Sequence, residues 1–182
     1  MEKRLRIIVC GVGFGQFYIR AIDKIKCKYK LVGILSRGSE WSKQWTKKYG
    51  VILYTDIDEI TKENVDVVCV VIKSTVVNGE GSTIVHSLLE KGINVIQEHP
   101  IDIDDYIMCI KIAQKNCCMY RLNTFYPQLS NVKQFIFLAG KLREKNDVQY
   151  INAECSVHVL FPLIDILGRA IGGRSEERRV GK

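Results

Sequence analysis

The sequence lacks the features of membrane-spanning and secreted proteins. Its 182 residues contain no apolar run close to the roughly 18 residues that cross a bilayer. The N-terminus starts with basic residues, but the short apolar stretch after them runs directly into a glycine-rich turn, which is unlike a signal peptide. We therefore expect a cytoplasmic protein without a membrane partner.

Cysteine is present, but not at the spacing of a metal site. The seven cysteines form no Cys-x-x-Cys pair, and the adjacent Cys117 and Cys118 do not suit a zinc knuckle. Cys10 and Cys69 lie inside apolar runs, where cysteine behaves as a small hydrophobic residue. We expect reduced thiols, as is usual in the cytosol, and no bound metal.

A dense basic stripe is also missing. The formal net charge is +7, but the basic residues are scattered, and the last nine residues, RSEERRVGK, alone carry four bases and two acids. Nucleic-acid-binding proteins more often show clustered basic residues interleaved with aromatic ones. The charge instead favours a phosphate-bearing ligand, and we expect no nucleic-acid partner.

What the first two thirds of the chain do contain is a regular alternation of strand and helix patterns. Strands are predicted over 6–11, 31–35, 52–54, 65–72, 92–100 and 119–123, and helices over 16–25, 39–49, 82–91 and 102–115. The run VDVVCVVI at 65–72 is typical of a strand buried on both faces. This order predicts an α/β fold, a doubly wound parallel-sheet Rossmann domain for nucleotide binding over residues 1–127.

The pattern changes after Pro127. A helix is predicted over 131–145, a strand over 150–159 and a strongly apolar segment over 160–171. We interpret residues 128–173 as the incomplete start of an α+β domain for substrate binding and dimerisation. Residues 174–182 are predicted to be a non-native tail, with a genuine basic tail as the alternative.

A glycine-rich turn follows the first strand and precedes the first helix. In VCGVGFGQFY, the glycines allow a tight turn and a close approach of the backbone to a pyrophosphate, next to free N–H groups at the helix N-terminus. The third glycine comes one residue earlier than in GxGxxG, and a plain strand-to-helix turn is the alternative. The predicted cofactor-binding residues here are Gly11, Val12, Gly13, Phe14 and Gly15.

The second strand ends without the acidic residue that NAD-binding folds usually place there for the ribose 2′-hydroxyl. The sequence has Ser36 and Arg37 instead. A hydroxyl and a guanidinium can bind a 2′-phosphate, which an acid would repel. We therefore predict NADPH as the cofactor, while an arginine in a surface turn is the alternative.

Three further groups of polar residues follow later strands, at the edge of the sheet where ligands bind. Ser74 and Thr75 follow the fourth strand and are predicted to contact the cofactor, although hydroxyls are also common local caps in turns. QEHP and NTFYP each close a strand on a proline, which presents His99 and Tyr126 as candidate proton donors. His86 and His158 are predicted to be structural.

Taken together, these residues resemble the glucose–fructose oxidoreductase/inositol dehydrogenase superfamily. Its members usually read Glu-Lys-Pro at the strand end where this chain has Glu98, His99 and Pro100. With FGQFY, KSTVVNGEG, VIQEHP and NTFYP, the chain is similar to the thiazolinyl imide reductases of siderophore biosynthesis over residues 5–171.

The resemblance implies an enzyme that uses NADPH to reduce a thiazoline ring to a thiazolidine. The substrate is expected as a thioester on a carrier domain of a non-ribosomal peptide synthetase, and the complete protein as a homodimer. His99 and Tyr126 become the catalytic residues, and Glu98 is expected to orient the cofactor ribose. A sugar or polyol dehydrogenase of the same superfamily, or a non-catalytic NADP-binding module, is the alternative.

Overall fold

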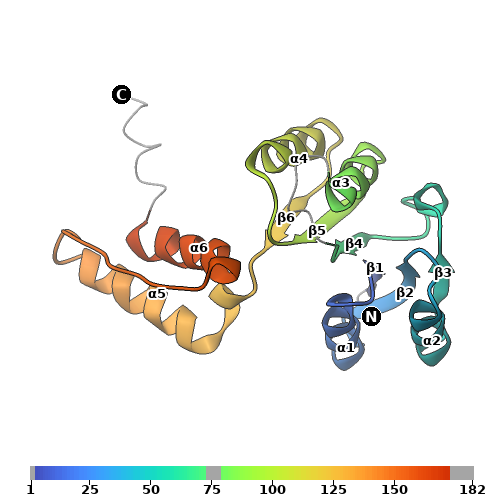
Figure 1. Cartoon of the computed structure of the whole chain (residues 1–182), viewed down its shortest axis with the longest axis horizontal. Helices are drawn as coiled ribbons and strands as arrows, with labels where there is room; N and C mark the ends of the chain where they lie inside the picture. The colour runs from blue at the N-terminus through green and yellow to red at the C-terminus, as the bar shows by residue number, and fades with distance from the viewer. Residues whose placement is uncertain (1–2, 73–78, 173–182) are drawn as a thin grey trace. The chain divides into compact units, whose positions relative to one another are not determined.

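Six parallel strands form the sheet of the N-terminal part of the chain, in the order β3-β2-β1-β4-β5-β6 (Figure 1). The computed structural model describes residues 3–72 and 79–172. The order reverses between β1 and β4, so the predicted doubly wound fold is confirmed. The strands are β1 Leu5–Cys10, β2 Tyr29–Leu35, β3 Ile52–Tyr54, β4 Val67–Val70, β5 Asn94–Glu98 and β6 Tyr120–Asn123.

Helices cover both faces of this sheet. Figure 1 shows α1 and α2 on one face and α3 and α4 on the other, as right-handed crossovers on the two sides of a reversal require. All predicted bounds in this part of the chain hold to within two residues. The helices are α1 Gly15–Lys24, α2 Glu40–Tyr49, α3 Glu80–Glu90 and α4 Ile103–Lys115, with a short 3₁₀ helix, η1, at Ile57–Glu59.

Local caps explain why the helix starts could be predicted. The Ser39 hydroxyl accepts a hydrogen bond from the Ser42 N–H, and an Asp102 carboxylate oxygen accepts one from the Asp104 N–H. Both caps satisfy backbone donors that the first helical turn leaves unpaired. Gly50 ends α2 in the left-handed conformation, which glycine adopts at little cost.

The core lies on both sides of β1 and β4. Ile8, Val9, Val68 and Val70 are fully buried, as the apolar pattern of these strands predicts. Cys10 and Cys69 are buried with them, which confirms their interpretation as small hydrophobic residues. Burial raises the pKa of each of these two thiols to about 12, so they remain protonated.

The aromatic residues of α2 are only partly core residues. Trp45 is buried and stacks on Tyr49, with 5.6 Å between ring centroids and 9° between ring planes. Trp41, one turn earlier, is not a core residue, because half of its surface is exposed. Four-residue steps exceed the 3.6-residue helical period, so the face drifts by about 80° between Tyr49 and Trp41.

Contacts along the chain define two compact units, Met1–Asn123 and Thr124–Lys182, which are described separately. In the second unit, α5 (Ser130–Arg143) lies beside α6 (Leu160–Ile171), and the Arg143 side chain donates to the Ala170 carbonyl (Figure 1). Two 3₁₀ helices, η2 (Tyr126–Gln128) and η3 (Val157–Val159), complete its elements.

The strand predicted over 150–159 is wrong. The segment is irregular up to η3, and Tyr150 and Ile151 are exposed. An apolar alternation becomes a strand only where a neighbouring strand pairs with it, and every strand pairing in the described residues lies in the first unit. In the same described residues, no helix is long and apolar enough to cross a bilayer.

Candidate active site

The turn after β1 has the close backbone packing that its glycines predict. Gly11 has φ +86°, and a Cβ atom there would lie 2.9 Å from the Val71 carbonyl oxygen. Gly15 is the first residue of α1, and a Cβ atom there would lie 3.0 Å from Val9 Cγ1. Gly11 therefore requires glycine for its conformation, and Gly15 allows a close approach of α1 to the sheet.

The remaining residues of this turn leave room for a phosphate. A Cβ atom on Gly13 would meet no described atom within 4 Å, while Val12 is buried below the turn. Phe14 occupies the N-cap position of α1 but has no polar side chain with which to cap it. The open position at Gly13 thus lies next to the N-terminus of α1, and helix N-termini favour anions.

A cavity of about 690 Å³ lies next to this turn. Its walls come from the carboxyl ends of β1, β2 and β3 and from the start of α3, which is the edge where ligands bind in doubly wound folds. Its polar and charged lining residues are Ser36, Arg37, Thr55, Asp56, Glu80 and Thr83. The predicted Ser36 and Arg37 are therefore brought together at one cavity beside the glycine turn.

Arg37 is not alone in this cavity. Its Nε atom donates to Glu80 Oε1 at 3.1 Å, and Nη2 donates to Glu80 Oε2, so the pair is bidentate. Hydrogen bonding to Glu80 raises the pKa of Arg37. The Ser36 hydroxyl accepts from the Gly38 N–H at 3.2 Å and so caps its own turn. Sequence reasoning missed Glu80, although its place in the first turn of a helix after the central strand β4 was a usable signal.

A second polar cluster forms where β5 ends. Glu98 is the last residue of this strand and is 8% exposed. Its Oε1 atom lies 2.7 Å from Nδ1 of His99 and accepts no other hydrogen bond from the described residues. His99 Nδ1 also lies 3.2 Å from the Asn123 carbonyl oxygen, at the end of β6. The structure thus brings together the side chains of Glu98 and His99, two of the candidate residues.

Two residues that the sequence did not indicate hold the other Glu98 oxygen. The Tyr18 hydroxyl of α1 donates to Glu98 Oε2, and Asn123 Nδ2 donates to the same oxygen at 3.1 Å and to the Tyr18 hydroxyl. Burial and the Glu98 hydrogen bond raise the pKa of Tyr18, so its hydroxyl remains a donor. The carboxylate is thereby fixed in orientation beside the imidazole.

The neighbouring carboxylate changes the acidity of His99. Its interaction with Glu98 raises the pKa of His99, and the partial loss of solvent opposes this effect without cancelling it. Since an unperturbed histidine has a pKa of about 6.5, the raised value keeps more imidazolium present near neutral pH. The interaction with Glu98 thus increases the fraction of His99 that is protonated at a given pH.

The other predicted residues lie elsewhere. Tyr126 belongs to the second unit, where it starts η2, and His99 belongs to the first, so the joint action of the two side chains stays a prediction. Tyr126 follows a tight turn at Phe125, which has φ +57° and ψ −62°, and its N–H donates to the Thr124 carbonyl at 2.7 Å. Ser74 and Thr75 lie outside the described residues.

A family model described as "Oxidoreductase family, NAD-binding Rossmann fold" matches residues 5–124. The chain belongs to this family, GFO/IDH/MocA. The match covers the sheet, the glycine turn and the Glu98–His99 corner. A comparison with curated proteins found no match.

Several solved structures share the fold of this chain at low sequence identity. GenD2 from gentamicin A biosynthesis, in complex with NAD, is 18% identical, with a TM-score of 0.69 over 79% of this chain and 41% of its own. Scyllo-inositol dehydrogenase from Lactobacillus casei, with NAD(H) and scyllo-inositol, is 20% identical, with a TM-score of 0.68 over 79% and 43%. WlbA from Bordetella pertussis, with NADH and UDP-GlcNAcA, is 15% identical, with a TM-score of 0.67 over 78% and 41%. The chain thus spans about two fifths of the length of these proteins.

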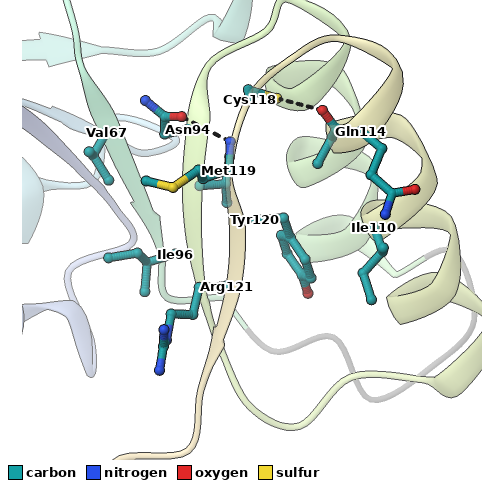
Figure 2. A pocket seen from close by; sticks show the side chains of 11 residues that line it. Val67, Asn94, Ile96, Ile110, Gln114, Cys118, Met119, Tyr120 and Arg121 are labelled. Carbon is teal, nitrogen blue, oxygen red and sulfur yellow. Dashed lines mark hydrogen bonds between the residues drawn. The ribbon is translucent and has the colours of Figure 1, made fainter. Parts of the chain in front are cut away.

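A second cavity, of about 430 Å³, lies against the edge strand β6 (Figure 2). Its lining includes Val67, Asn94 and Tyr120, the first residues of β4, β5 and β6. In a GFO/IDH/MocA domain the cofactor binds at the other end of the strands, so this cavity is not part of the cofactor site. Asn94 instead has a structural role at this end of the sheet. Its Oδ1 accepts a hydrogen bond from the Met119 N–H, and its Nδ2 donates one to the Asp66 carbonyl.

Proposed function

We propose that this chain is the nucleotide-binding part of an NADPH-dependent thiazolinyl imide reductase of siderophore biosynthesis. The observation that carries the proposal is His99, which stands next to Glu98 where the related enzymes usually have lysine. An imidazole with a raised pKa suits protonation of a ring nitrogen near neutral pH. The enzyme class, an oxidoreductase, follows from the family alone.

The residues around the glycine turn fit the proposed cofactor. The N–H groups after Phe14 and the open space over Gly13 suit the pyrophosphate, and Arg37 with Ser36 is assigned to the ribose 2′-phosphate. Ser74 and Thr75 are assigned to the nicotinamide side, and Glu98 to the nearby ribose. When bound, NADPH supplies the hydride for the imine carbon.

The protein's own part in the reaction is to supply and hold a proton. Glu98 engages Nδ1 of His99, which makes Nε2 the atom that carries the transferable proton in this proposal. Tyr126 is the second donor, with an unperturbed tyrosine pKa of about 10 that keeps it protonated at neutral pH. As negative charge develops on the thiazoline nitrogen, one of these two groups protonates it.

The proposed substrate is a thiazoline held as a thioester on a carrier domain of a non-ribosomal peptide synthetase. The carrier domain is thus the expected macromolecular partner, and a homodimer is the expected form of the complete protein. Both assignments rest on the motifs FGQFY, VIQEHP and NTFYP and on His99 among them.

The test uses two variants, His99→Ala and Tyr126→Phe, in a protein that includes a complete substrate domain. Reduction of a carrier-bound thiazoline with NADPH is measured at steady state. We expect kcat to fall by about 10²–10⁴-fold in the variant that loses the principal donor. If both variants keep a kcat near that of the wild type, the assignment is wrong.

A sugar or polyol dehydrogenase is the second candidate, because a scyllo-inositol dehydrogenase has the same fold. A dehydrogenase of this kind should be active with a polyol and NAD⁺ and inactive with a thiazoline. A non-catalytic NADP-binding module would bind the nucleotide and turn over neither substrate. Assaying both substrates with the same protein separates the three functions.

A further inference from the structure

The Arg37–Glu80 pair joins two elements across the mouth of the 690 Å³ cavity. Arg37 follows β2, whereas Glu80 begins α3, 43 residues further along the chain. Both nitrogen–oxygen contacts of the pair use the Nε–Nη2 edge of the guanidinium, an edge that can also bind an oxyanion. The pair thus occupies two of the Arg37 donors that could bind the ribose 2′-phosphate.

The position of Glu80 supplies the acid that the end of β2 lacks. A carboxylate beside the ribose is compatible with a 2′-hydroxyl but repels a 2′-phosphate. Glu80 therefore acts against a phosphate in two ways, by its own charge and by its hold on Arg37. The side chains are 83% and 47% exposed, so their attraction is weak enough for an incoming phosphate to displace Glu80.

We propose that Glu80 is a specificity-determining residue, which sets the preference between NADP(H) and NAD(H) by holding the Arg37 guanidinium in a bidentate ion pair. NADP(H) binding requires Arg37 to exchange the Glu80 carboxylate for the 2′-phosphate, whereas NAD(H) binding leaves the pair intact. This inference rests on the proposed use of the cavity for the adenosine side of the cofactor, and it adds a residue that opposes the preference for NADPH.

The experiment measures Kd for NADP⁺ and NAD⁺ by calorimetry in the wild-type chain and in Glu80→Gln. We expect NADP⁺ to bind about three- to tenfold more tightly to the variant, which corresponds to the loss of a weak ion pair and of one repulsive charge. The Kd for NAD⁺ should change by less than about twofold. Equal Kd values for NADP⁺ in the two proteins overturn the proposal, as does a tighter Kd for both nucleotides.

Two controls isolate the pair. Asp56→Asn removes the same charge from the lining of the same cavity. Asp56 accepts a hydrogen bond from the Asp58 N–H, so its substitution frees no guanidinium. It should therefore give a smaller gain for NADP⁺ than Glu80→Gln, and an equal gain overturns the role of the pair. The second control adds Glu80→Gln to an Arg37→Gln chain. The gain in NADP⁺ affinity should then be less than half of the gain seen with Arg37 present, and a full gain contradicts the proposal.

The proposed cofactor can fail separately. A wild-type chain that binds NAD⁺ more tightly than NADP⁺ contradicts NADPH as the natural cofactor. The ratio of the two Kd values in Glu80→Gln, compared with that in the wild type, still tests the role of Glu80.

Discussion

The two units of the chain differ sharply in how they bury apolar side chains. Among the buried aliphatic, aromatic and cysteine residues of the described chain, all but Ala170 lie in the N-terminal unit. In the second unit, by contrast, more than half of the surface of several large side chains on α5 is exposed, namely Phe135, Phe137, Leu138 and Leu142. A sheet covered by helices on both faces closes a core by itself, whereas two adjacent helices leave their outer apolar faces in water.

This difference also separates the parts of the candidate site. The glycine turn, the Arg37–Glu80 pair and the Glu98–His99 corner all belong to the unit with the core, so packed strands and helices fix their positions. Tyr126 lies in the unit that packs less of its own surface, and 38% of it is exposed. We therefore expect a rigid cofactor site in the first unit and a less constrained Tyr126 side chain in the second.

The largest expected effect comes from removing a core side chain. Leu88 of α3 is fully buried, with an exposed fraction of 0%. Leu88→Ala should lower the free energy of unfolding by about 2–5 kcal/mol, through lost transfer energy and the cavity left behind. The matched change in the second unit, Phe137→Ala at 62% exposure, should cost less than about 1 kcal/mol. Urea unfolding followed by circular dichroism measures both, and equal losses would remove the distinction between the units.

The same contrast explains which parts could be predicted from the sequence. The elements of the first unit follow from local patterns and caps such as Ser39 and Asp102, which act within three residues. The segment 150–159 could not be predicted, because a strand depends on a partner that alternation alone does not reveal. In the site, Glu98 and His99 are neighbours in sequence and were found, whereas Glu80 and Tyr18 meet their partners across 43 and 80 residues.

A medium effect is expected from an ion pair that joins two strands. Arg6 of β1 binds both carboxylate oxygens of Asp66, just before β4, and hydrogen bonding to Arg6 lowers the pKa of Asp66 to about 2. An unfolded Asp has a pKa of about 3.9, so the unfolded chain takes up the proton first as the pH falls. The stabilisation is therefore present above about pH 4 and is lost between about pH 4 and pH 2.

Asp66→Asn should accordingly lower the free energy of unfolding by about 1–2 kcal/mol at pH 7, with no difference from the wild type near pH 2. The comparison in the second unit is Glu144→Gln, whose partner Lys141 lies three residues earlier, in the last turn of α5. Such a pair contributes only about 0.2–0.5 kcal/mol. Thermal unfolding at a series of pH values tests both, and a pH-independent loss in Asp66→Asn would refute the linkage.

The smallest effect concerns the acidity of His99 and tests whether the first unit alone sets it. Glu98→Gln removes the charge that raises the pKa of His99, so this pKa should fall toward that of an unperturbed histidine. Tyr18→Phe removes one of the two hydrogen bonds that Glu98 Oε2 accepts and should change the same pKa by less. The stabilisation from the protonated pair is present below about pH 6.5 and is lost as the pH rises through the folded pKa of His99. Both variants should therefore reduce this pH dependence of the free energy of unfolding. NMR titration of the histidine ring protons measures these pKa values, with His86 of α3 as an internal reference. If Tyr126→Phe shifted the pKa of His99 as far as Glu98→Gln does, the first unit alone would not set this pKa.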